Sequence, residues 1–154
     1  MSEEPLFSVE VELQNLQDAL EIDSAVIEDL VSFVLHLENH GGRIGICFVD
    51  DEQIAKLHGD FMDDPTATDV ITFPLEEPLE GILDGEIVIS TDTAIRQATE
   101  RNCSVLREVY LYVVHGLLHL LGHDDLEAKQ AEAMNQLQEA HLVSWGQSRG
   151  FIQE

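Results

Sequence analysis

The chain has 154 residues and a formal net charge of −24, with a pI near 4.2. This length fits one domain over residues 1–154 with a sizeable core, and the charge excludes binding to nucleic acid through overall attraction. Residues 1–7 lack the features of a signal peptide, and no apolar run approaches the roughly 20 residues of a membrane span. Cys47 and Cys103 form no CxxC pair. We expect a cytoplasmic protein with no membrane or DNA partner.

The first half of the chain alternates strand and helix patterns. Apolar spacing predicts, in order, a strand over 7–14, a helix over 25–40, a strand over 43–50, a helix over 51–61, a turn over 63–68 and a strand over 69–74. Asp23 or Ser24 is expected to cap the first helix, and Gly41 with Gly42 to end it.

The second half is predicted to be mainly helical. It is expected to hold a loop over 75–85, a strand over 86–90, a helix from Thr91 or Asp92, a helix over 105–121 capped by Ser104, and a last helix over 126–145 followed by Gly146. The helix over 105–121 is apolar nearly all round, which places it in the middle of the domain. The pattern predicts an α+β or α/β-like fold with about four strands and about five helices.

The run HGLLHLLGHDD, residues 115–125, concentrates the chemistry of the chain. Four residues advance a helix by about 400°, so His115 and His119 share one face about 6 Å apart along the axis. Gly122 permits the bend after which one of residues 123–125 can fold back. Two histidines, one carboxylate and a water describe a catalytic zinc site with an open position.

The His-x3-His spacing alone is weak evidence for a metal site. His36 and His40 share it in an earlier helix, where nothing nearby completes a site. For His115 and His119 the alternative is a pair of hydrogen-bonded core histidines. A shared metal would satisfy the polar atoms of both imidazoles at once.

Several segments resemble the YbeY family of bacterial endoribonucleases. Residues 115–125 are similar to its signature, His-Gly-x-Leu-His-Leu-x-Gly-x-Asp-His, and residues 64–74, 85–98 and 105–116 resemble other stretches in the order of the family. The resemblance covers about residues 44–140. It implies a small sheet with helices around one zinc ion, and metal-dependent RNA cleavage in small-subunit rRNA maturation and ribosome quality control.

The resemblance also implies which residues hold the metal. The three histidines of the signature fall on His115, His119 and position 125, where this chain has Asp125. Zinc accepts a carboxylate, but Asp125 would make bound water less acidic and harder ions such as Mn²⁺ more competitive. His123 is the alternative third ligand. Asp124 matches the aspartate of the signature and is expected to orient a ligand imidazole.

A second departure concerns phosphate binding. In the family an arginine near the metal holds phosphate, and Met62 stands at the aligned position. Arg96, Arg101 and Arg107 are the candidates to replace it in binding RNA. The alternative is that these three arginines form helix salt bridges.

The general base is left open among His58, Asp69 and His123, and Asp69 could equally brace the turn before its strand. Gly116 stands where HExxH peptidases carry a glutamate, which disfavours the metalloprotease interpretation suggested by the His-x3-His-x5-Asp spacing. The leading hypothesis is a single-metal endoribonuclease. The second is an assembly factor with a structural or vestigial metal, which reaches rRNA or the small ribosomal subunit through a basic ribosomal protein.

Overall fold

The structure is a computed structural model that describes residues 8–62, 69–74 and 81–150. Expectations placed on residues 1–7, 63–68 and 75–80 lie outside this description, as does the side chain of Met62. The elements are β1 (Val9–Asn15), α1 (Ser24–Leu37), β2 (Gly41–Val49), α2 (Asp51–Met62), β3 (Val70–Pro74), β4 (Ile82–Ser90), α3 (Thr91–Arg101), α4 (Val105–Leu120) and α5 (Ala128–Arg149).

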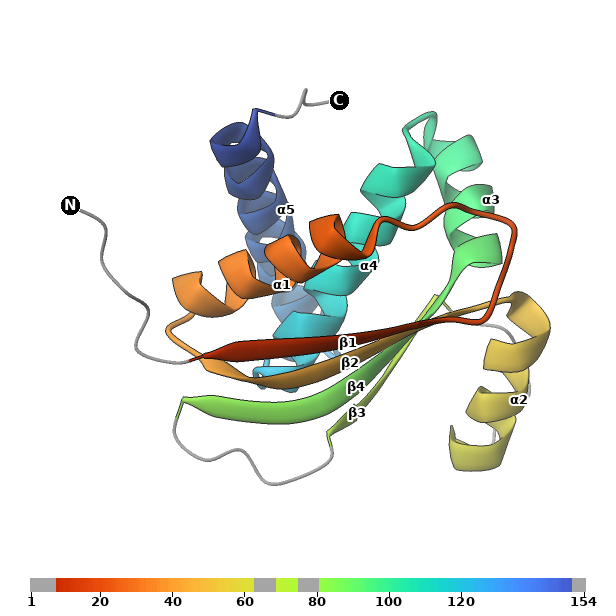
Figure 1. Ribbon diagram of the computed structural model, residues 1–154, viewed down its shortest axis with the longest axis horizontal. Coiled ribbons are helices and arrows are strands. Elements are labelled where there is room, and N and C mark those ends of the chain that lie inside the picture. The colour runs from red at the N-terminus through yellow and green to blue at the C-terminus, as the bar shows by residue number, and fades with distance from the viewer. Residues whose placement is uncertain (1–7, 63–68, 75–80, 151–154) are drawn as a thin grey trace.

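The four strands form one mixed sheet in the order β1-β2-β4-β3. β1, β2 and β4 are parallel, and β3 is antiparallel to β4. Figure 1 shows α1, α4 and α5 over one face of the sheet and α2 on the other. The α+β fold with four strands and five helices is thus confirmed. None of the described helices is both long enough and apolar enough to span a bilayer.

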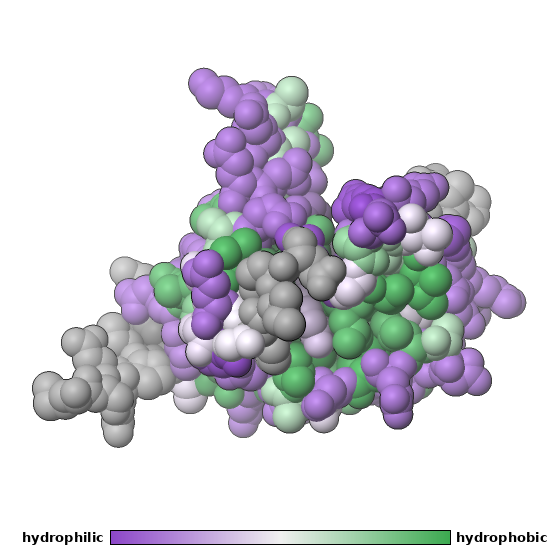
Figure 2. Space-filling view, turned by 90° about the horizontal axis from the view of Figure 1, so that it is seen from above, coloured by the Kyte–Doolittle hydropathy of each residue, from purple (hydrophilic) through white to green (hydrophobic). Residues whose placement is uncertain are grey.

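The main core lies between the sheet and α4. Ile44, Ile46 and Phe48 alternate along β2 and are at most 2% exposed, and Val113 and Leu117 of α4 are fully buried. α4 is flanked by α1 and α5, which explains why its sequence is apolar nearly all round. Seen from above, much of the helical side is hydrophilic, and apolar side chains gather toward the end where α3 and α4 meet (Figure 2).

The turn between α1 and β2 differs from the expectation. α1 is capped by Asp23, as predicted, but it ends at Leu37, and Asn39 makes the left-handed turn with a φ of 58°. The prediction that Gly41 and Gly42 end the helix is wrong, since both residues open β2. Gly42 is needed there because its φ is 129° and an added Cβ would lie 1.9 Å from the backbone oxygen of Leu83.

Two other predicted boundaries are wrong. β4 begins at Ile82 instead of Glu86, because residues 82–85 continue the ladder with β2, so the loop predicted over 75–85 stops short of them. α5 runs through Gly146 to Arg149, and Gly146 is buried within the helix. Ser104 caps α4 as predicted, with its Oγ accepting a hydrogen bond from the Arg107 backbone N–H at 3.0 Å.

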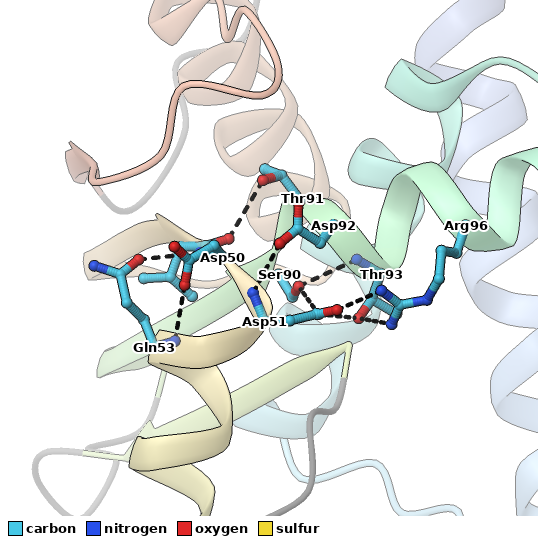
Figure 3. A network of polar contacts seen from close by, with 9 residues as sticks. Asp50, Asp51, Gln53, Ser90, Thr91, Asp92, Thr93 and Arg96 are labelled. Carbon is cyan, nitrogen blue, oxygen red and sulfur yellow. Dashed lines mark hydrogen bonds and ion pairs between the residues drawn. The ribbon is translucent and has the colours of Figure 1, made fainter.

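A polar network joins α2 to α3 where β2 and β4 end side by side (Figure 3). One carboxylate oxygen of Asp51, at the start of α2, accepts hydrogen bonds from Ser90 Oγ at 2.7 Å and Thr93 Oγ1 at 2.9 Å. The other oxygen pairs with the guanidinium of Arg96 on α3. The Asp51 backbone N–H donates to Asp92 at 3.0 Å, so the first turns of both helices are tied together.

We expect Gly42→Ala to lower the free energy of unfolding by at least about 3 kcal/mol, because the new methyl group meets backbone that cannot move without opening the β2–β4 ladder. Gly45→Ala is the matched control on the same strand, where a Cβ would lie 3.3 Å from the flexible side chain of Glu86. Urea unfolding followed by circular dichroism measures both. Equal destabilisation would contradict this account of Gly42.

The Asp51 network also predicts a pH dependence. Burial alone would raise the pKa of Asp51, but hydrogen bonds from Arg96, Ser90 and Thr93 outweigh it and lower the pKa below the ordinary 3.8. The stabilisation is therefore present above pH 3.8 and is lost as the pH falls through the lower pKa of the folded state.

Accordingly, Asp51→Asn is expected to be less stable than the wild type at pH 7, and the difference should shrink between about pH 5 and pH 2. Urea titrations across this range test it. Asp60→Asn, at an exposed position of the same helix, controls for the loss of one negative charge. A difference that stays constant with pH would rule out the proposed role of Asp51.

Candidate metal centre

Side chains of α4 and β4 pack against glycines of the facing element at the level of the two histidines. A Cβ added to Gly116 would lie 2.8 Å from Ile87 Cγ2, and one added to Gly85 would lie 2.8 Å from Leu120 Cδ2. Glycines on both elements thus bring the helix against the strand. His115 and His119 are each only about one-quarter exposed, so the packed helix holds both imidazoles at the edge of the core.

The chain reverses after α4 as the sequence predicted. Gly122 has a φ of 103°, and its backbone N–H donates to the carbonyl of His119 at 3.0 Å. Asp124 then accepts hydrogen bonds at one carboxylate oxygen from the backbone N–H groups of Asp125, at 2.8 Å, and Leu126, at 3.3 Å. Asp124 therefore shapes the turn itself through this oxygen, and its expected role in orienting an imidazole stays a prediction.

This turn returns Asp125 to the two histidines. The Nε2 atoms of His115 and His119 are 3.1 Å apart, and Asp125 Oδ2 lies 3.8 Å from the first and 3.5 Å from the second. One donor atom from each residue lies within 4.8 Å of the others, the only such cluster of three among the described residues. Two imidazole nitrogens and a carboxylate oxygen form a donor set that suits zinc, so the residues fit a bound ion.

Sequence reasoning missed Gln138 of α5. Its Oε1 lies 2.8 Å from His115 Nδ1, and its Nε2 donates to Asn135 Oδ1 at 3.2 Å. Because an amide oxygen only accepts, Nδ1 of His115 carries the proton and Nε2 keeps a lone pair facing the cluster. The sequence contained a signal: Gln138 is a polar residue four positions from both Met134 and Leu142, on the buried face of α5.

The rival ligand His123 lies apart from this cluster. Its Nε2 is 3.9 Å from Glu38 Oε1, at the end of α1. Asp69 accepts a hydrogen bond at Oδ1 from the Val70 backbone N–H at 2.8 Å, and its carbonyl accepts one from Ser90. His58 belongs to α2, which lies on the face of the sheet opposite α4 (Figure 1). None of the three candidate bases belongs to the donor cluster.

The three candidate RNA-binding arginines all meet carboxylates. Arg96 pairs with Asp51. Arg101 donates to Glu108, which is fully buried, at 2.9 Å, and Arg107 donates to Glu139 at 2.6 Å. These salt bridges are the alternative that the sequence left open for the three arginines. To contact RNA, each guanidinium would have to bind a phosphate beside the carboxylate with which it already pairs.

This is a small α+β protein with a candidate single-metal centre. Its fold is a four-stranded mixed sheet with a buried helix that bears the His-x3-His pair, and the turn after this helix returns an aspartate to the pair. The chain belongs to the YbeY endoribonuclease family, since the family model described as Endoribonuclease YbeY matches residues 12–146. The match extends beyond the 44–140 range of the sequence resemblance and confirms it. The enzyme class that the resemblance implied, a nuclease, is the class of this family.

Individual relatives agree with this assignment. The chain is 36% identical to the endoribonuclease YbeY of Carboxydothermus hydrogenoformans, covering 90% of this chain and 99% of the relative. It is 34% identical to that of Clavibacter michiganensis, over 90% and 96%. The solution structure of TM1509 from Thermotoga maritima superposes with a TM-score of 0.64 at 26% identity, over 91% and 92% of the two chains.

We predict that Gln138→Leu weakens zinc binding about tenfold, because His115 loses the acceptor that fixes its protonated nitrogen. Competition with a chromophoric chelator measures the dissociation constant. Asn135→Ala is the control, since Asn135 contacts Gln138 without reaching the histidine. An unchanged dissociation constant in Gln138→Leu would show that Gln138 is dispensable for the site.

Proposed function

We propose that this protein is a metal-dependent endoribonuclease of rRNA maturation and ribosome quality control, formed by one domain over residues 1–154. The observation that carries the proposal is the cluster of His115, His119 and Asp125, in a chain of the YbeY family. One zinc ion per chain is the proposed cofactor, and the carboxylate ligand makes Mn²⁺ a competitor.

A zinc ion held by these residues would polarise a phosphoryl oxygen and lower the pKa of a bound water. The chain supplies the rest of the site. Gln138 fixes the tautomer of His115, and Asp125 adds one negative charge where the family signature has a histidine. Asp125 is 38% exposed and the imidazoles about one-quarter exposed, so the cluster is open to solvent.

The structure gives a physical reason to disfavour peptidase chemistry. Position 116, where HExxH enzymes carry the catalytic glutamate, has no room for even a Cβ beside Ile87. The packing of Gly116 against β4 therefore supports a hydrolase whose general base is not a residue of the metal-binding helix.

Charge favours an rRNA target that is presented by another molecule. All five arginines pair with carboxylates, and a hollow of about 420 Å³ on the sheet face opposite α4 is lined in part by Glu12 and Glu86. A basic ribosomal protein would complement this surface and bring the small-subunit rRNA to the site.

The two cysteines are free, which suits the cytoplasm.

The proposal predicts that His115→Ala and Asp125→Ala each lower both zinc content and cleavage of a small-subunit rRNA precursor transcript by at least about 100-fold. His123→Ala should still bind one zinc per chain at saturating metal. Mass spectrometry of the metal content and gel analysis of the RNA measure the two effects.

His36→Ala, purified in parallel, is the matched control, because His36 belongs to the other His-x3-His pair and lies outside the cluster. It should keep both zinc and cleavage. Cleavage that persists unchanged in His115→Ala would reject the metal-dependent nuclease. Zinc binding without cleavage in any preparation would favour the assembly factor with a structural metal.

A further inference from the structure

We propose that Glu38, held in place by His141, positions the turn that delivers Asp125 to the two histidines. Glu38 is then a positioning residue, which pairs with His123 and His141 but with none of His115, His119 and Asp125. The inference rests on the proposed metal centre, and it assigns a task to two histidines that the centre does not use.

Glu38 lies between two histidines from different parts of the chain. Its Oε2 is 2.7 Å from Nε2 of His141 on α5, and its Oε1 is 3.9 Å from Nε2 of His123 in the turn after α4. The carboxylate is only 24% exposed and the His141 side chain 11%, so the pair is sheltered from competing water. One acidic side chain at the end of α1 thus hydrogen-bonds to α5 and faces the turn.

The backbone of Glu38 is held at the end of α1. Glu38 caps the C-terminus of α1, and its N–H donates to the carbonyl of Val34 at 3.0 Å. Its own carbonyl lies 2.6 Å from Nδ1 of His40, just before β2 begins. Glu38 is therefore anchored to the core before it meets the turn.

The turn meets Glu38 through His123. The His123 backbone N–H donates to the carbonyl of Leu118 at 2.9 Å, and the side chain then leans toward Glu38. Asp125 follows two residues later and reaches the cluster. His123 faces Glu38 and lies outside the donor set, in which Asp125 is the third member.

One face of α5 carries both the residue that contacts His115 and the residue that holds Glu38. Gln138 and His141 are three residues apart and both buried, and they contact His115 and Glu38 respectively. α5 thus orients one ligand directly and, through Glu38, the turn that carries another.

The test is the zinc dissociation constant, measured by chelator competition, in Glu38→Gln, in His123→Ala and in the double variant. We expect each single change to weaken zinc binding about tenfold. The double variant should be no weaker than either single variant, because both changes break one contact. This cycle separates positioning from simple loss of a nearby negative charge, which would weaken binding equally with or without His123.

Asp29→Asn is the matched control. Asp29 is also a carboxylate of α1 that binds α5, through Trp145 at 2.9 Å and Arg149 at 2.7 Å, but no contact joins it to the turn. It should lower thermal stability and leave zinc affinity within about twofold of the wild type. Amide hydrogen exchange over residues 121–127 should rise in Glu38→Gln and stay unchanged in Asp29→Asn.

Wild-type affinity in Glu38→Gln, or losses that multiply in the double variant, would overturn this inference while leaving the metal centre intact. A wild-type protein that binds no zinc would overturn the metal centre and the inference with it. The two failures are therefore distinguishable in one set of titrations.

Discussion

The close approach of α4 to β4 is the constraint on which the rest of the structure depends. Gly116 faces the buried Ile87 and Gly85 faces Leu120, each so closely that an added Cβ would have to displace the facing side chain. Tight packing of this kind holds a helix in one position and one rotation. The rotation of α4 decides that His115 and His119 face out of the core together, and it sets where the chain must turn to bring back Asp125.

Most elements could be predicted from the sequence because each carries a local signal. Apolar periodicity gave α1 and β2 nearly complete, and Ser104 marked the start of α4 through its side-chain oxygen. The boundaries that failed depend on partners far along the chain. Residues 82–85 have turn-like composition, yet they form a strand because β2 provides an adjacent ladder. Gly146 looks like a helix end, yet tertiary packing keeps it inside α5.

The candidate site divides in the same way. The spacing of the two histidines and the glycine bend are local, and the sequence predicted the turn that the structure contains. Gln138 is 23 residues from His115, and Glu38 is 103 residues from His141, so neither contact leaves a trace in local spacing. The ligand roles of Asp125 and His123 stay predictions, although the structure brings Asp125 to the histidines and His123 to Glu38.

The pairing of every arginine with a carboxylate has a consequence for how the protein meets RNA. Most RNA-binding proteins lose affinity as salt rises, because binding releases counterions condensed on the phosphates. This chain has a net charge of −24, and its guanidinium groups are already paired with carboxylates. It therefore has few cationic groups with which to displace those counterions. Its encounter with RNA is governed instead by long-range repulsion, which dissolved ions screen over a Debye length of about 8 Å at physiological ionic strength. For this protein the ionic atmosphere assists the approach of RNA, the reverse of its usual effect.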